Sequence, residues 1–405
     1  MTKKIMFLFL LFGYVYATTF NIFMTGVFRI PAPVVFLAPL IYFYRTEITH
    51  FSYGKELMVI FVAALFFYLI GQADITGFFA LLIVAGCFAL LFNYVIGTNL
   101  KRMNIAIAFF FGVLLLSGLI MFIDHQYNMA PIRSLLAQED VLQSPAGISS
   151  TIFTFGYQMA ALTPFMVVNA VLFKRSWLLN LLLFGLSLCL IFFGMQRSVL
   201  VAFIVVVGLF FLSYYKFKSI LLFGLLAGVF FIAQSSLEQF SGDKKQQNIL
   251  NKSAENAKGK EERGDLMGEN IQIIADYPFG LLFYGKTWND VVQHNFVYKK
   301  GPIVITSHNA YLMFITYLGP LLGFILLILL YHKVGKVVFY AFLHVKDKKN
   351  AMLVCLSCSF IAISINSFFH NEWLLATSGP TLFLYFAILQ LSKIKMEDPI
   401  LIQYN

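Results

Sequence analysis

The sequence predicts an all-α polytopic membrane protein, with about twelve transmembrane helices and one large extracytoplasmic loop. Three observations lead to this class. The 405 residues are 60% hydrophobic and 12% charged, with a mean hydropathy of +0.81, whereas a soluble domain carries about 25% charged residues. Apolar runs long enough to cross a bilayer recur along the chain. One long polar segment, residues 234–307, interrupts them late in the chain.

The individual spans follow from the length rule, since a transmembrane helix needs about 20 mostly apolar residues. They are expected at residues 5–23, 28–44, 56–72, 76–97, 104–123, 151–173, 177–194, 198–214, 218–233, 309–331, 351–370 and 374–391. The second span is short and contains three prolines, which predicts a kink or a tilt. The chain therefore divides into an N-terminal transmembrane bundle (1–233, about nine spans), the large loop (234–307) and C-terminal transmembrane helices (308–405, about three spans).

The basic residues predict the orientation. With the N-terminus in the cytoplasm, the short inner segments hold most of the lysines and arginines outside the large loop, as the positive-inside rule requires. Lys101, Arg102, Lys174 and Arg175 are examples. Both termini are then cytoplasmic and residues 234–307 lie outside. The net charge of +10 is thus explained by topology, and no nucleic-acid partner is expected.

The second part of the large loop predicts an amphipathic helix on the membrane surface. From Glu261 onward, Leu266, Met267, Ile271 and Ile274 recur at near-helical spacing. The helix is expected to end before Pro278, because proline cannot continue it.

A histidine–asparagine pair stands where this loop meets the next apolar run. His308 and Asn309 lie at the predicted mouth of a membrane helix, on its outer side. A histidine there can exchange a proton near neutral pH, beside a substrate held by its lipid tail in the same bilayer. The alternative is an interfacial histidine that only bonds loop backbone. His294 and His370, each followed by asparagine, are rivals; His370 is expected to be an interfacial anchor.

Three outward arginines are candidates for binding an anion. A guanidinium suits diphosphate oxygens because its planar fork donates two parallel hydrogen bonds. Arg197 begins a span after a very short outer connection, where positive charges are disfavoured. It is therefore interpreted either as a residue that binds an anionic ligand or as one member of a structural ion pair. Arg263 opens the amphipathic helix and is otherwise a solvated charge. Arg133, in the polar loop 124–150, has no motif around it.

One span is unusually polar. Its polar residues are expected to face the bundle interior, where they either line a lipid or glycan path or join helices. They are Thr151, Thr154, Gln158, Thr163 and Asn169.

No familiar cofactor motif occurs in the sequence. Phosphate-binding glycine loops, zinc-ligand spacings and serine nucleophile elbows are all missing. Cys355 and Cys358 have the spacing of a redox or metal pair, but they lie within an apolar run and are interpreted as small packing residues. A mechanism without metal or cofactor is therefore expected.

Three local patterns together resemble the bacterial O-antigen polymerase and O-antigen ligase superfamily. They are Gln196-Arg197-Ser198 before an apolar span; Arg263 followed by Ile271-Gln-Ile-Ile-Ala-Asp-Tyr-Pro-Phe-Gly280; and Ser307-His308-Asn309-Ala-Tyr-Leu312 leading to Leu318-Gly319. They cover residues 190–332, and the first half of the chain matches in topology alone. Many members have a further glycine soon after Pro-Phe-Gly, where this chain has Leu281-Leu282-Phe283, which leaves the geometry between Arg263 and His308 open.

The resemblance implies a membrane glycosyltransferase of the GT-C type in the bacterial inner membrane. Its donor would be an undecaprenyl-diphosphate-linked oligosaccharide, its acceptor a sugar hydroxyl, and a chain-length regulator a further partner beside membrane lipid. Arg197 and Arg263 would hold the diphosphate, His308 would take the proton of the acceptor hydroxyl, and Asn309 would position the histidine or its helix end. Polymerisation of O-antigen or a similar surface polysaccharide is the expected outcome, because the Ser-His-Asn-Ala-Tyr-Leu form is closer to the polymerases.

Two alternatives remain open at this point. An O-antigen ligase would join the same glycan to lipid A–core with the same chemistry. A transporter or flippase for a lipid-linked glycan would want charged residues inside the spans, and the expected spans hold almost none.

Overall fold

The computed structural model describes residues 2–22, 32–219, 249, 263–293, 299–300, 303–304, 306–376 and 379–396. Among them, all regular structure is helical except for one antiparallel pair of two-residue strands, β1 (Lys299–Lys300) and β2 (Ile303–Val304). The prediction of an all-α polytopic membrane protein is confirmed.

Seven helical segments of the described residues are long and apolar enough to cross a membrane. They are Gly54–Gly71, Ile75–Ile96, Leu100–Asp124, Ile152–Leu172, Arg197–Tyr215, Ala310–Leu343 and Lys348–Asn366. Shorter apolar helices cover Ala32–Tyr44, Trp177–Phe193 and Gly379–Ile394. The expected span at 218–233 falls almost wholly outside the described residues, so the total number of spans stays a prediction.

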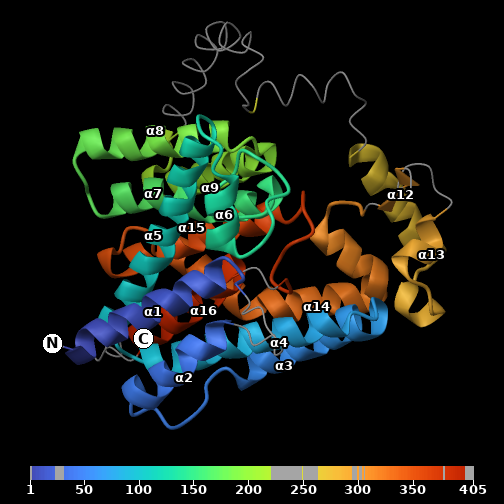
Figure 1. Ribbon diagram of the computed structural model, residues 1–405, viewed down its shortest axis with the longest axis horizontal. Helices are drawn as coiled ribbons and strands as arrows, with labels where there is room; N and C mark the ends of the chain where they lie inside the picture. The colour runs from blue at the N-terminus through green and yellow to red at the C-terminus, as the bar shows by residue number, and fades with distance from the viewer. Residues whose placement is uncertain are drawn as a thin grey trace, which may run out of the picture. The chain divides into compact units, whose positions relative to one another are not determined.

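The chain forms two compact units. Unit 1 comprises Met1–Val113, Glu262–Val337 and Ser367–Asn405, and unit 2 comprises Leu114–Glu261 and Val338–Asn366. The division falls within two long helices, α5 (Leu100–Asp124) and α14 (Ala310–Leu343). Figure 1 labels the helices of both units.

Unit 1 is built around α16 (Gly379–Met396), whose side chains from Thr381 to Leu391 are all buried. A helix that is apolar all round must be enclosed by protein on every side. Phe383 of α16 stacks on Phe110 of α5, with ring centroids 4.1 Å apart. Further helices of unit 1 are α1 (Thr2–Thr19), α2 (Ala32–Tyr44), α3 (Gly54–Ala64) with the π-helical turn Leu65–Gly71, and α4 (Ile75–Leu90) with the π-helical turn Leu91–Ile96.

Unit 1 also holds the helices of the large loop. These are α12 (Arg263–Asp276), a 3₁₀ turn at Leu281–Tyr284, and α13 (Trp288–Val292). As Pro278 predicted, α12 ends at Asp276.

Unit 2 is built around α7 (Ile152–Leu172), which packs against α8 (Trp177–Phe193), α9 (Arg197–Tyr215) and α15 (Ala351–Asn366) (Figure 1). The short helix α6 (Ala130–Ala137) lies in the loop after α5. Cys355 and Cys358 are buried, unpaired thiols within α15, as packing residues would be.

The polar residues of α7 join parts of unit 2. The Gln158 amide accepts a hydrogen bond from the Ser117 hydroxyl of α5 at 2.5 Å and donates one to the carbonyl of Ile148 at 2.8 Å. The Ser187 hydroxyl of α8 donates to the Thr163 carbonyl at 3.3 Å. Gln158 and Thr163 are both buried. At Gln158 the structure supports helix joining rather than a glycan path, whereas the Thr163 hydroxyl donates to the Met159 carbonyl within α7.

Candidate functional site

The candidate site in unit 1 lies where α14 begins. Asn309 is the residue before the helix, and its Oδ1 accepts a hydrogen bond from the backbone N–H of Leu312 at 3.0 Å. An asparagine in this position satisfies one of the N–H groups that a helix leaves free at its start. Asn309 thus caps α14, and its supporting role beside His308 stays a prediction.

His308 stands directly before this cap in an unusual backbone conformation. Its φ is +52°, in the left-handed region that side chains other than glycine seldom adopt. Its neighbours Ser307 and Asn309 are buried, at 2% and 5% exposure, while His308 itself is half-buried. A residue stays in such a conformation when its surroundings fix it, and such positions cluster at active sites.

A second segment, Ser367–Asn371, holds the His308 loop in place. The backbone N–H of Ala310 donates to the carbonyls of Ser367 at 3.1 Å and His370 at 2.9 Å. The Asn371 side chain donates through Nδ2 to the Thr306 hydroxyl at 2.7 Å. Two of the three histidine–asparagine pairs in the sequence are therefore brought together in unit 1.

The prediction that His370 is an interfacial anchor is wrong. His370 is 3% exposed and Trp373 is 1% exposed, so both side chains are enclosed by the protein. Trp373 packs edge-on against the rings of Tyr311 and Phe314 of α14. The third pair, His294 and Asn295, lies outside the described residues.

The helix that Arg263 opens is tied to α14. The Thr316 hydroxyl of α14 donates to the Asn270 side-chain oxygen of α12 at 2.5 Å, and both residues are buried. Arg263 is the first residue of α12, two helical turns before Asn270; its side chain is outside the description. Arg263 therefore begins α12, the His308 loop leads into α14, and a buried hydrogen bond joins these two helices.

The apolar residues of α12 lie on two faces of the helix, and its expected place on the membrane surface stays a prediction. The buried positions are Leu266, Asn270 and Ile273, whereas Met267 and Ile271 are 38% and 58% exposed. The helix buries the face that carries Asn270, because that residue has a polar partner in Thr316. Neither Asn270 nor Thr316 stands out in the sequence, because the role of each depends on its partner in another helix.

Two glycines from the second and third of the sequence patterns, Gly280 and Gly319, are in direct backbone contact. Gly280 (φ +93°) follows the end of α12, and Gly319 (φ +76°) interrupts α14. A Cβ added at Gly280 would lie 2.1 Å from the Gly319 nitrogen, and one at Gly319 would lie 2.4 Å from the Phe279 carbonyl carbon. The segment after α12 therefore docks directly on the kink of α14. Leu281, Leu282 and Phe283, where many members have a further glycine, form a 3₁₀ turn together with Tyr284.

Arg197 belongs to unit 2, where it is the half-buried first residue of α9. The turn before it contains Met195 in the left-handed region (φ +54°) and the buried Gln196, which packs on Gly156 of α7. A ring nitrogen of His125 lies 3.0 Å from the Phe193 carbonyl at the end of α8. These contacts define the backbone from which the Arg197 side chain extends.

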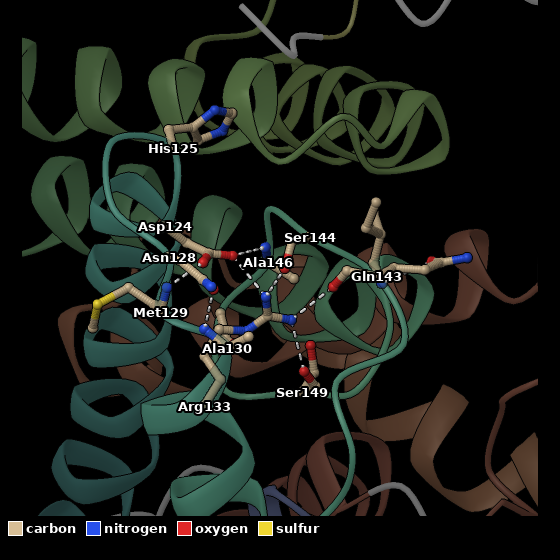
Figure 2. A network of polar contacts seen from close by, with 12 residues as sticks. Asp124, His125, Asn128, Met129, Ala130, Arg133, Gln143, Ser144, Ala146 and Ser149 are labelled. Carbon is tan, nitrogen blue, oxygen red and sulfur yellow. Dashed lines mark hydrogen bonds and ion pairs between the residues drawn. The ribbon is translucent and has the colours of Figure 1, made fainter.

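Arg133, the third candidate arginine, has a structural role. It is fully buried in unit 2 and forms an ion pair with Asp124 at 2.6 Å. Figure 2 shows the guanidinium enclosed by the loop that follows α6. It donates over 2.6–2.9 Å to Asp124, Ser144 Oγ and the carbonyls of Gln143, Gly147 and Ser149. Burial lowers the pKa of this guanidinium, and the attraction of Asp124 opposes that shift.

Substituting Arg133 by lysine is expected to destabilise the protein by about 2 kcal/mol, because an ammonium cannot reach all of these acceptors and leaves buried carbonyls without donors. The measurement is the thermal unfolding midpoint of the detergent-purified protein. The matched control is Arg175→Lys, at an exposed arginine of the same unit. Equal midpoints for the two variants would contradict the structural role of Arg133.

Within the described ranges, no three His, Cys, Asp or Glu side chains are grouped so that they could hold a metal ion. Chemistry without metal or cofactor stays a prediction from the sequence.

Comparison with known proteins adds one match. Residues 182–328 match the model of a family described as O-antigen ligase. The matched stretch contains Arg197, Arg263 and His308, and it is consistent with the O-antigen polymerase and ligase superfamily, so the predicted resemblance is confirmed there. No curated protein matches the chain. The match indicates a glycosyl-transfer function of the O-antigen ligase or polymerase type in a multi-pass membrane protein.

Proposed function

We propose that this membrane protein, which resembles the O-antigen ligase family over residues 182–328, transfers an undecaprenyl-diphosphate-linked glycan to a sugar hydroxyl and so polymerises O-antigen or similar repeat units. The observation that carries the proposal is the conformation of His308. A histidine is held at positive φ at the start of a membrane helix, within a stretch that matches a glycosyl-transfer family.

The proposed reaction is a single displacement. The hydroxyl oxygen of the acceptor attacks the anomeric carbon of the donor, the bond from that carbon to the diphosphate oxygen breaks, and the configuration inverts. His308 takes the hydroxyl proton as the new bond forms, a step that contributes about 10²–10⁴-fold in general acid–base catalysis. Undecaprenyl diphosphate leaves with the bonding electron pair.

Arg197 and Arg263 are proposed to hold the diphosphate. The leaving group gains negative charge as the bond breaks, and preorganised guanidinium groups stabilise such charge without a metal. Asn309 supports His308 by fixing the start of α14, where its side chain caps the helix.

The proposed location is the bacterial inner membrane, with both termini in the cytoplasm and the site on the periplasmic side. The basic residues of the sequence support this orientation. If α9 enters from outside at Arg197 and α14 also begins outside at Ala310, one further crossing is needed between them. The apolar residues 218–233 of the sequence are proposed to supply it, as a short span.

An O-antigen ligase is the second candidate, and the description of the matched family favours it. The two activities share donor and chemistry, and they differ in the acceptor: a polymerase uses another lipid-linked repeat unit, whereas a ligase uses lipid A–core.

The test is a gel of surface lipopolysaccharide, together with extracted lipid-linked glycan, from a strain that lacks the gene. Core carrying a single repeat unit is expected for loss of a polymerase. Bare core, with long polymer retained on the lipid carrier, would instead identify a ligase. Bare core with only single repeat units on the lipid carrier would favour the transporter alternative. An unchanged ladder with unchanged lipid-linked glycan would contradict a role in O-antigen assembly and direct the test to another surface polysaccharide.

A further inference from the structure

The Thr306 hydroxyl connects two segments that are far apart in sequence. Its oxygen accepts hydrogen bonds from Nδ2 of Asn371 at 2.7 Å and from the backbone N–H of His308 at 3.4 Å. A hydroxyl oxygen has two acceptor positions, so these two bonds use both of them. Asn371 thereby reaches the backbone of His308 through a single intermediate atom.

These bonds complete the fixation of the His308 backbone. On the C-terminal side, Asn309 caps α14, and the N–H of Ala310 is held by two carbonyls of the segment Ser367–Asn371. On the N-terminal side, Thr306 provides the hold. A residue at positive φ is expected to move to a more favourable backbone conformation when one of the hydrogen bonds that hold it is removed.

We infer that Asn371 and Thr306 are positioning residues for His308, so that the segment Ser367–Asn371 is part of the functional site. This inference rests on the proposed function, in which His308 takes a proton from the acceptor hydroxyl. Proton transfer requires the two heavy atoms at hydrogen-bonding distance, and a displacement of about 1 Å is enough to slow a reaction strongly. The positioning residues are therefore expected to affect kcat, whereas the affinity for the lipid-linked donor depends on the arginines.

The test uses the purified full chain in detergent, with undecaprenyl-diphosphate-linked oligosaccharide extracted from the strain lacking the gene. Released undecaprenyl diphosphate is measured. Thr306→Val is isosteric and lacks the acceptor, and Asn371→Leu lacks the donor; each is expected to lower kcat about tenfold while KM for the donor changes less than about twofold. Thr306→Ser retains the oxygen and is expected to keep kcat within about twofold of the wild type.

The double variant Thr306→Val/Asn371→Leu tests whether the two residues act through one shared hydrogen bond or lower kcat independently. Because both residues act through one bond, its kcat is expected to be about tenfold low, not a hundredfold. Thr46→Val is the matched control, since Thr46 is a half-buried threonine of unit 1 whose hydroxyl also bonds backbone, at Tyr94; its kcat is expected to equal that of the wild type. Size exclusion and unfolding midpoints establish that each variant is folded.

His308→Ala is measured in the same series. An inactive His308→Ala with fully active Thr306→Val and Asn371→Leu would overturn the positioning role alone. A folded, active His308→Ala would overturn the assignment of His308 as the base, on which the positioning role rests, whereas wild-type protein that releases no undecaprenyl diphosphate would overturn the proposed function itself. Multiplicative losses in the double variant, or a kcat of Thr306→Ser as low as that of Thr306→Val, would also contradict positioning through the Thr306 oxygen.

Discussion

Replacement of His308 by glutamine is expected to lower the rate of glycan transfer by about 10²–10⁴-fold. Glutamine is polar and of similar size, so it can still form hydrogen bonds in the loop, but it cannot accept a proton and release it again near neutral pH. Binding of the lipid-linked donor is expected to persist, because the arginines proposed for that role are unchanged. The loss should therefore appear in kcat more than in KM.

Two other histidines make this experiment discriminating. His370 is buried in the segment next to the His308 loop, so His370→Gln tests the rival base. His344 is exposed near the opposite end of α14, and His344→Gln controls for the substitution itself. The assay is release of undecaprenyl diphosphate by purified protein, together with restoration of the lipopolysaccharide ladder in cells. Retained activity in a folded His308→Gln, with loss in His370→Gln, would move the base to His370.

Predictions that depend on local rules agree with the structure. Apolar length predicted the seven described helices that are long and apolar enough to cross a membrane, because a bilayer of fixed thickness requires about 20 residues in each helix. Pro278 predicted the end of α12, and the position of Asn309 before an apolar run predicted a helix start. Each of these features depends on residues within about one helical turn, so the sequence contains the information in one place.

Features that depend on distant partners were missed. Arg133 appeared to be an outward charge because three of its acceptors are backbone carbonyls, which every residue has. Asn270 interrupts the apolar face of α12, and its partner Thr316 lies in another helix. His370 appeared to be a membrane anchor because nothing in the chain shows that its segment folds onto the His308 loop. In each case a polar group is buried because a particular partner satisfies it.

The motif glycines are likewise explained by a partner that is distant in sequence. Gly280 and Gly319 were part of the resemblance, but sequence patterns gave no reason for them. The structure provides it: the two backbones touch where the segment after α12 crosses the kink of α14. The second and third sequence patterns thus contact each other through these two glycines. This contact fixes the segment that follows α12 against α14, the helix that begins after His308.

Gly280→Ala and Gly319→Ala are each expected to destabilise the protein by about 4 kcal/mol. The added methyl group meets backbone atoms at 2.1 Å and 2.4 Å, which cannot rotate away as a side chain would, and both residues have φ values that alanine rarely adopts. Backbone strain of about 1–3 kcal/mol and overpacking of similar size add in the same direction. The measurement is the unfolding midpoint of the detergent-purified protein.

Two further glycines of the same loop isolate the causes. Gly285 has φ +58° with open space around a new Cβ, so Gly285→Ala should show only the conformational cost, about 1 kcal/mol. Gly268 lies within α12 and also has open space, so Gly268→Ala should stabilise the helix by up to about 1 kcal/mol. The expected order of midpoints is Gly268→Ala above wild type, then Gly285→Ala, then Gly280→Ala and Gly319→Ala. If Gly280→Ala were no worse than Gly285→Ala, the backbone crossing would not be a tight contact in the folded protein, and the attachment of the Arg263 loop to α14 would have to be sought elsewhere.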